Sequence, residues 1–101
     1  MKKIVLVCAQ GMSTGMLMNK MRAAAEKQGY ECSIEAYAVS AARTKAADAD
    51  VILVGPQVRY ELDNVKNMFP DKPVAVINMV DYGRLNGEGV LNNAKKLMND
   101  E

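Results

Sequence analysis

The chain has 101 residues, which is the length of one domain and leaves no room for a second. Its 13 Lys and Arg against 12 Asp and Glu give a formal net charge of +1, so no strongly charged surface for nucleic acid or membranes is expected. A composition that is 50% hydrophobic and 25% charged excludes both a disordered and a membrane-spanning chain.

The sequence contains no histidine and two cysteines, Cys8 and Cys32. Without an imidazole, this chain cannot use a histidine as base, nucleophile or metal ligand, and we expect neither a metal nor another cofactor. Two cysteines do not make a disulfide framework, so we expect a reducing, cytoplasmic location. The longest early apolar run, residues 4–9, is too short for a membrane helix or for the core of a signal peptide.

The first elements are marked by their apolar patterns. Residues 3–9 are continuously apolar, which predicts a strand buried on both faces. After a loop over residues 10–15, an amphipathic helix is predicted to run to Gly29, which suits a left-handed cap. Its apolar stripe comprises Met16, Leu17, Met21, Ala24 and Ala25. The alternation over residues 32–38 predicts a half-buried strand, at an edge of the sheet.

The second half of the chain repeats this alternation of strand and helix. Ser40 is predicted to cap a short Ala-rich helix that ends near Ala47. Residues 51–54 form a second fully buried strand, and residues 74–77 form the fourth. Between these strands we expect a helix that Pro70 ends. The apolar positions of this helix are Val58, Leu62, Val65 and Phe69.

A loop rich in turn residues, 81–87, is predicted to lead into a last helix. The apolar positions of that helix are Val90, Leu91, Ala94, Leu97 and Met98. Strands and helices alternate throughout, so we predict a single three-layer α/β domain over residues 1–101. Right-handed crossovers and helices on both faces favour a four-stranded parallel sheet in the order 2-1-3-4.

In an open parallel sheet, ligands bind beyond the carboxyl ends of the strands, where the strand order reverses. Here that point lies between the first and third strands, and it collects residues 8–15 and 55–59. Cys8 ends the first strand, directly before a loop that opens a helix. A helix start offers unpaired N–H groups that bind anions and favour an anionic sulfur. We therefore predict that Cys8 is a nucleophile for a phosphoryl group held by loop amides.

Structural interpretations of the same residues remain open. A cysteine that ends a buried strand also serves as a small apolar residue, as Cys8 would then do. Gly11 and Gly15 equally suit a turn and close helix packing, and Ser13 and Thr14 equally suit capping of the helix. For Cys32, which has no cation or helix start nearby in the sequence, we predict packing.

The segment Cys8-Ala-Gln-Gly-Met-Ser-Thr-Gly15 resembles the enzyme IIB components of the sugar phosphotransferase system, lactose/cellobiose/chitobiose type. Two further segments resemble the same family, Ile52-Leu-Val-Gly-Pro-Gln-Val-Arg-Tyr60 and Tyr82-Gly-Arg-Leu-Asn-Gly-Glu-Gly-Val-Leu91. The likeness covers essentially the whole chain. It implies a single IIB domain, a phosphotransferase that works by a phosphocysteine.

The resemblance also implies partners and roles. Cys8 would accept phosphate from a phosphohistidine of a IIA protein and donate it to a sugar bound by the membrane-embedded IIC protein. The sugar would be a β-linked disaccharide such as cellobiose, chitobiose or lactose. The protein would bind no nucleic acid, would not insert into the membrane and would be a monomer on its own. The phosphate-binding loop would comprise Ala9, Gln10, Gly11, Met12, Ser13, Thr14 and Gly15.

Transfer between two proteins requires a sulfur that stays exposed while each partner docks over the same patch. We therefore look for partner contacts around Cys8, among apolar and polar residues suited to a transient interface. The candidates are Met12, Met16, Gln57, Arg59 and Tyr82.

Two alternative functions remain open. The expected fold resembles that of low-molecular-weight tyrosine phosphatases, which place an arginine six residues after the cysteine, where this chain has Thr14. A cysteine-dependent phosphatase or arsenate reductase would need Arg59 or Arg84 as the phosphate clamp and Asp81 as general acid. The Asp-Tyr-Gly context of Asp81 is typical of a turn, so a solvated carboxylate is favoured there over a general acid. The other alternative is a flavodoxin-like binding module in which Cys8 is inert.

Overall fold

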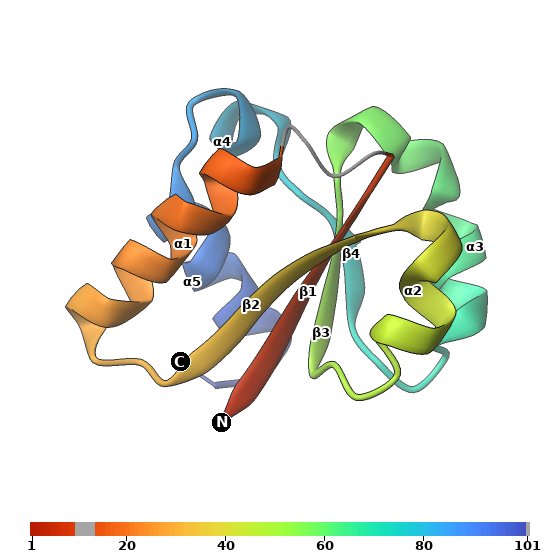
Figure 1. The fold of residues 1–101 in the computed structure, drawn as a ribbon, viewed down its shortest axis with the longest axis horizontal. Helices are drawn as coiled ribbons and strands as arrows, with labels where there is room; N and C mark the ends of the chain where they lie inside the picture. The colour runs from red at the N-terminus through yellow and green to blue at the C-terminus, as the bar shows by residue number, and fades with distance from the viewer. Residues whose placement is uncertain (10–13, 101) are drawn as a thin grey trace.

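Four parallel strands form one sheet, in the order β2-β1-β3-β4. This order is seen in a computed structural model that describes residues 1–9 and 14–100 (Figure 1). The central strands are β1 (Lys2–Cys8) and β3 (Val51–Val54). The edge strands are β2 (Cys32–Ala38) and β4 (Val74–Val76). The predicted fold class and strand order are confirmed.

Helices lie on both sides of the sheet, which gives three layers (Figure 1). On one side are α1 (Thr14–Gln28), α4 (Met79–Gly83) and α5 (Gly87–Leu97). On the other are α2 (Val39–Lys45), the 3-10 helix η1 (Pro56–Glu61) and α3 (Leu62–Met68). Within residues 1–9 and 14–100, no helix has the length and apolar character needed to cross a bilayer.

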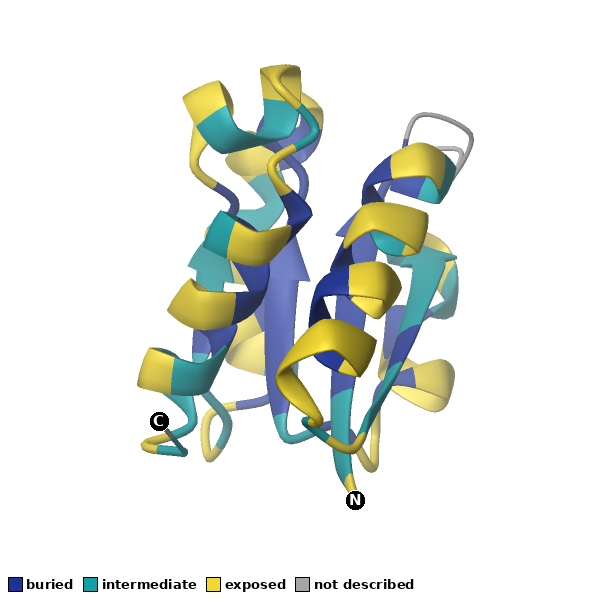
Figure 2. Ribbon diagram, turned by 90° about the vertical axis from the view of Figure 1, so that its left-hand side faces the viewer, coloured by how far each residue is buried: buried dark blue, intermediate teal, exposed yellow. Residues whose placement is uncertain are grey.

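The central strand β1 supplies both halves of the core. Successive side chains of a strand point to opposite faces, so Ile4 and Leu6 face the α1 and α5 side while Val5 and Val7 face the α2 and α3 side. All four are fully buried, and each contributes about 1.5–3 kcal/mol of apolar burial. Figure 2 shows buried residues along the sheet and on the inner faces of the helices.

Helix α1 turns one stripe to this core and ends at Gly29, whose φ of 67° confirms the predicted left-handed cap. Its buried residues are Thr14, Leu17, Met21, Ala24 and Ala25. The inclusion of Met16 in that stripe was wrong, since this residue is 63% exposed. Each helical residue turns by about 100°, so the neighbour of a buried Leu17 points away from the core.

Two predicted helix starts were wrong. Helix α2 begins at Val39, with Ala38 in the cap position and no side-chain cap bond, so Ser40 lies inside the helix. Strand β2 runs directly into this helix and leaves no separate capping residue. The α-helix expected from Val58 begins only at Leu62, because residues 56–61 form the 3-10 helix η1, which Pro56 starts with a preset helical φ.

The expected loop over residues 81–87 contains a short helix instead. The side chain of Asn78 accepts hydrogen bonds from the N–H groups of Val80 and Asp81 and so caps α4. A tight turn follows, in which Leu85 has a φ of 54°, and α5 then begins with Asn86 as its cap. The last helix is confirmed, with its predicted apolar stripe buried or half-buried.

Candidate functional site

Cys8 is the last residue of the central strand, at the carboxyl end of the sheet. It pairs in register with Ala38 at the end of β2. On the β3 side, the N–H of Gly55 donates to the carbonyl oxygen of Val7 at 2.8 Å. A Cβ on Gly55 would lie 3.8 Å from the Cβ of Cys8, so a residue without a side chain borders the cysteine there. The cysteine thus lies at the point where the strand order reverses, as predicted.

The sulfur of Cys8 has two polar neighbours. Its Sγ lies 3.5 Å from the hydroxyl oxygen of Thr14, the first residue of α1, and 3.7 Å from the carbonyl oxygen of Tyr37 in β2. Cys8 is 3% exposed and Thr14 is fully buried. The expectation of an exposed sulfur was therefore wrong. The side chain at the end of the central strand is enclosed by the neighbouring strand and the first turn of a helix.

The rest of the predicted phosphate loop is described only at its two ends. Ala9 is exposed immediately after β1, and Gly15 is half-buried in the first turn of α1. No described atom lies within 4 Å of the position of a Cβ on Gly15, so close helix packing does not explain this glycine. The predictions for the other four residues lie outside the described residues. They are Gln10, Gly11, Met12 and Ser13.

Two hollows flank η1 near the cysteine. The first has a volume of about 520 Å³, and its lining includes Ala9, Ala38, Ser40, Val58, Tyr60 and Glu61. The second has a volume of about 250 Å³ and is lined by Pro56, Gln57, Arg59, Met79, Tyr82 and Gly83. Three of the predicted partner contacts, Gln57, Arg59 and Tyr82, therefore share one hollow.

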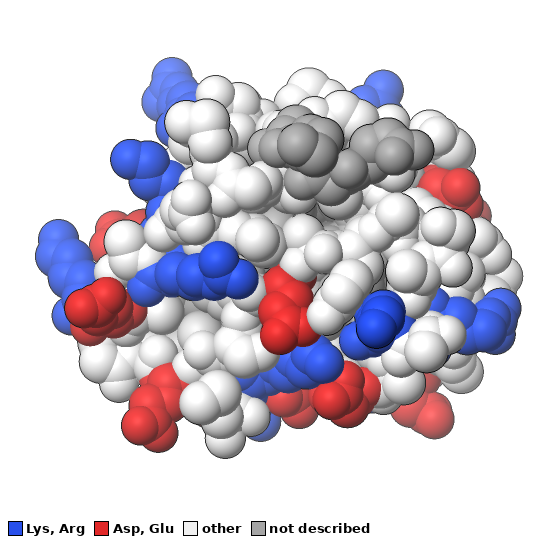
Figure 3. Space-filling view, in the orientation of Figure 1, with Lys and Arg blue, Asp and Glu red and all other residues white. Residues whose placement is uncertain are grey.

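Exposed apolar side chains gather in the segments that follow the strands at this end. Met16, Tyr60, Met79 and Val80 are 60–76% exposed and belong to α1, η1 and α4. In Figure 3 most charged groups lie across the middle and lower parts of this face, and a few Lys and Arg side chains lie at its upper edge. Sequence reasoning missed Tyr60 and the Met79–Val80 pair. The pair comes shortly after β4, at the carboxyl end of a strand, and that was the available signal.

Two of the three residues that a phosphatase would require, Arg59 and Asp81, make other contacts. Arg59 donates from Nη1 to the carbonyl oxygen of Pro56 at 3.4 Å, within its own 3-10 helix. Arg84 is exposed at the end of α4. Asp81 lies in α4 rather than in a turn, and its Oδ1 accepts from Nδ2 of Asn86 at 3.1 Å.

The second cysteine, Cys32, begins β2 and so lies at the opposite end of that strand from Tyr37. It is half-buried and packs against the core on the α1 side, as predicted. Burial raises the pKa of the Cys32 thiol, while the positive charge of Lys95 acts in the opposite direction. At neutral pH this thiol is therefore expected to react slowly.

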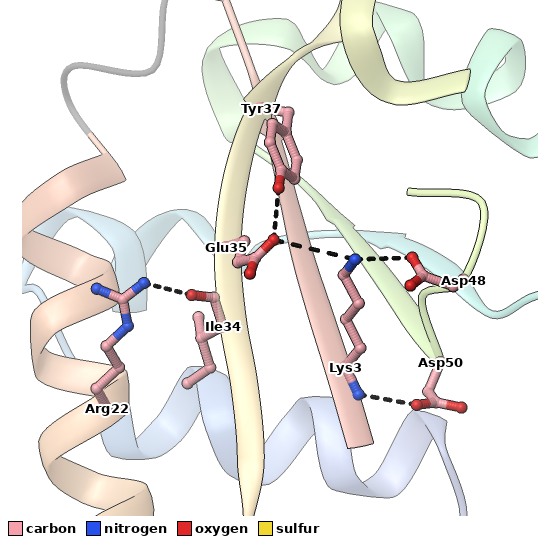
Figure 4. Close-up of polar contacts among 7 residues, drawn as sticks. All are labelled: Lys3, Arg22, Ile34, Glu35, Tyr37, Asp48 and Asp50. Carbon is pink, nitrogen blue, oxygen red and sulfur yellow. Dashed lines mark hydrogen bonds and ion pairs between the residues drawn. The ribbon is translucent and has the colours of Figure 1, made fainter. Parts of the chain in front are cut away.

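A polar network ties the amino-terminal half of β1 to its neighbours (Figure 4). Lys3 Nζ lies 2.7 Å from Asp48 and 4.0 Å from Glu35, and the N–H of Lys3 donates to Asp50 at 2.8 Å. The hydrogen bond with Asp48 raises the pKa of Lys3 and lowers that of Asp48. The hydrogen bond to Glu35 raises the pKa of Tyr37. We interpret this network as structural, since it joins β1 and β2 to the segment before β3.

Comparison with known proteins identifies relatives along almost the whole chain. The family model of the "PTS system, Lactose/Cellobiose specific IIB subunit" matches residues 3–93. The chain is 40% identical to the galactose-specific EIIB component of Lactococcus lactis subsp. cremoris and 37% identical to the oligo-beta-mannoside-specific EIIB component of Bacillus subtilis. Each alignment covers 97% of this chain and 97% of the relative.

Solved structures give the same result. The cellobiose-specific IIB component of Borrelia burgdorferi is 35% identical, with a TM-score of 0.82 over 98% of this chain and 93% of that one. The lactose-specific IIB domain of Streptococcus pneumoniae, at 18% identity, shares the fold with a TM-score of 0.83 over 95% and 96%. A mutant form of YwlE from Bacillus subtilis, at 14% identity, shares the fold with a TM-score of 0.53 over 99% of this chain and 95% of that one. Because the family model and these relatives span nearly the whole chain, the protein belongs to the lactose/cellobiose-specific IIB subunit family of the sugar phosphotransferase system.

Proposed function

We propose that this protein is a cytoplasmic phosphoryl relay in which Cys8 is the phosphorylated residue. The Cys8 thiolate attacks the phosphorus of a phosphohistidine on a IIA protein, the P–N bond breaks and an S–P bond forms. A hydroxyl of a sugar bound by the IIC protein then attacks the phosphorus, and the sulfur leaves as thiolate. A cysteine suits both steps, because its thiolate is both a strong nucleophile and a good leaving group.

The observation that carries the proposal is the position of Cys8. It ends the central strand, and its sulfur contacts the first residue of the 15-residue helix α1. A helix start directs N–H groups and the positive end of the helix dipole toward a bound anion. A phosphoryl group on this sulfur would therefore lie at an electrostatically favourable place.

The burial of Cys8 adds a condition to this mechanism. With only 3% of its surface exposed, the sulfur cannot meet an in-line donor without a local rearrangement. We propose that docking of the partner or arrival of the phosphoryl group exposes the sulfur. In the unphosphorylated protein, the same burial would protect the thiol from oxidation.

We further propose that both partners dock on the surface that holds the two hollows and the exposed apolar side chains described above. Exposed Met16, Tyr60 and Met79 supply adaptable apolar contacts, and Gln57 and Arg59 supply polar ones. Since each partner must reach the same sulfur, IIA and IIC should bind in turn rather than together.

The proposed acceptor is a β-linked disaccharide such as cellobiose, chitobiose or lactose. Relatives named for cellobiose and oligo-beta-mannoside support this class of β-linked sugar, while another relative is named for the monosaccharide galactose. The IIC protein, rather than this chain, would select among these sugars.

The decisive experiment is intact mass measured after incubation with a phosphorylated IIA protein of this family. The parent should gain one phosphoryl group and lose it when IIC and sugar are added. Cys8→Ser should gain none, because a serine hydroxyl is almost wholly protonated at neutral pH and no histidine can activate it. Cys32→Ser is the matched control and should relay like the parent. A Cys8→Ser protein that accepts phosphate and passes it on would overturn the proposal.

The phosphatase alternative predicts a different time course. In the relay, Thr14 stands where a phosphatase has its clamp arginine, and Asp81 accepts a hydrogen bond from Asn86. The phosphocysteine of the relay should therefore persist for hours at neutral pH. The phosphorylated mass should decay equally slowly in the parent and in Asp81→Asn. Loss within minutes in the parent, prevented by Asp81→Asn, would instead indicate a phosphatase with Asp81 as general acid.

A further inference from the structure

The sulfur of Cys8 lies between two groups of different hydrogen-bonding chemistry. The carbonyl oxygen of Tyr37, 3.7 Å away, can only accept. The hydroxyl of Thr14, 3.5 Å away, can donate or accept. Both side chains of the Cys8–Thr14 pair are almost fully buried, so bulk water does not compete for this contact.

Either atom could donate in the contact between a Cys8 thiol and Thr14, whereas a thiolate can only accept. A thiol carries one proton, and the carbonyl of Tyr37 is the acceptor placed to receive it. The hydroxyl of Thr14 can then donate to a sulfur lone pair. When the sulfur carries no proton, as a thiolate does, a favourable contact at this distance requires Thr14 to be the donor.

We propose that Thr14 is a catalytic residue whose hydroxyl stabilises the sulfur of Cys8 as it leaves the phosphoryl group. The proposal rests on the phosphoryl relay described above. In this step the acceptor oxygen forms a bond to phosphorus and releases its proton to solvent. The S–P bond breaks and its electron pair stays on the sulfur. Thr14 keeps its own proton and donates a hydrogen bond to the developing negative charge.

This role differs from that of a clamp arginine at the same position. A guanidinium binds the phosphoryl oxygens, whereas the hydroxyl of Thr14 contacts the sulfur itself. A hydrogen bond to the departing sulfur stabilises it whichever nucleophile attacks the phosphorus in line. Such help suits a relay, in which the phosphoryl group must return to IIA or move on to a sugar through the same departing thiolate.

Thr14→Val and Thr14→Ser test the proposal. Valine keeps the shape and removes the donor, while serine keeps the donor. Phosphorylated protein is mixed with unphosphorylated IIA, and loss of the phosphoryl group is followed by intact mass in single turnover. Thr14→Val should release about 10- to 100-fold more slowly, since hydrogen bonds to charged groups have effects of that order. The half-saturating IIA concentration should stay within about twofold, because only the chemical step changes. Thr14→Ser should recover most of the lost rate.

A purely structural role for Thr14 predicts another pattern. Release by Thr14→Val at the parent rate, or release by Thr14→Ser as slow as by Thr14→Val, would overturn the proposal. A failure of the parent itself to accept phosphate would overturn the relay instead. In that case, iodoacetamide labelling of Cys8 at pH 7 in a Cys32→Ser background still tests the hydrogen bond. Labelling should be slower with Thr14→Val than with Thr14→Ser, and equal rates would contradict the inferred donor.

Discussion

Gly87 at the start of α5 lies against Lys20 of α1 so closely that a Cβ would be 2.3 Å from the backbone carbonyl carbon of Lys20. The same Cβ would lie 2.5 Å from the backbone nitrogen of Met21. No real Cβ approaches backbone so closely, so a side chain here would push α5 away from α1. Gly87 therefore helps to set the position of α1, whose first residue, Thr14, contacts Cys8.

Gly87→Ala should destabilise the protein by about 2 kcal/mol or more, because the clash outweighs the better helix propensity of alanine. Urea unfolding followed by circular dichroism measures the change. Gly83→Ala is the matched control, since no described atom lies within 4 Å of its Cβ position. It should leave the free energy of unfolding unchanged or slightly increased. Equal stability of the two variants would contradict the close approach of the two helices.

Asn86→Ala should cost about 1–2 kcal/mol of stability, because Asn86 makes two contacts. Its Oδ1 accepts from the N–H of Gly89 at 3.1 Å and caps α5, and its Nδ2 donates to Asp81 at 3.1 Å. Asn93→Ala, an exposed change within α5, is the control and should cost nothing. Thermal unfolding of both variants distinguishes loss of the cap from a general effect of removing an amide.

Some parts of the fold could be predicted from the sequence, whereas the contacts of Asn86 and Gly87 could not. The apolar runs of β1 and β3 identify buried strands, and the rules for right-handed crossovers and helix coverage then give the observed sheet order. Residues 81–87 were predicted as a loop because α4 has five residues, too few for a helical period. Within the segment that resembled the family, residues 82–91, the contacts of Asn86 and Gly87 have a structural role.

The site was predictable in position but not in its contacts. Cys8 at a strand end and a helix start just beyond it can be read from the sequence. The contact between Cys8 and Thr14 depends on how α1 packs, which Gly87 sets from a distant part of the chain. The burial of the sulfur likewise depends on where β2 ends, since the Tyr37 carbonyl belongs to that edge strand.

Tyr30→Phe should weaken the pH dependence of stability in alkali. The hydroxyl of Tyr30 donates to Asp100 at 2.5 Å, and burial together with this hydrogen bond raises the pKa of Tyr30 well above 10. Well below pH 10, the ordinary pKa of tyrosine, both folded and unfolded chains keep the proton, so the stabilisation is fully present. Above pH 10 the unfolded chain releases its proton first, and the free energy of unfolding falls.

Urea titrations at several pH values between 7 and 12 measure this effect. Tyr30→Phe should lose about 0.5 kcal/mol at pH 7, a small value because the bond lies near the surface. Its stability should then decline less steeply than that of the parent above pH 10. Tyr60→Phe, at an exposed tyrosine, should follow the parent. An equally steep decline in Tyr30→Phe would show that Tyr30 does not carry the alkaline sensitivity.

Arg22→Ala should promote self-association through the edge of the sheet. Nη2 of Arg22 donates to the carbonyl oxygen of Ile34 at 2.5 Å, and it reaches β2 from the side away from β1 (Figure 4). An edge strand offers unpaired backbone groups to another chain, and a charged side chain that covers one of them blocks that pairing. Removal of the guanidinium should also cost about 1 kcal/mol of stability.

Sedimentation velocity over a range of protein concentrations measures the self-association. The sedimentation coefficient of Arg22→Ala should rise with concentration more steeply than that of the parent. Arg43→Ala removes the same charge from the exposed face of α2 and controls for the change in net charge. If both variants associate equally, lower charge repulsion is the cause and β2 is not the contact. If only Arg22→Ala associates, the carbonyl of Ile34 is the group that the arginine protects, since no other change distinguishes the edge of β2 in the two proteins.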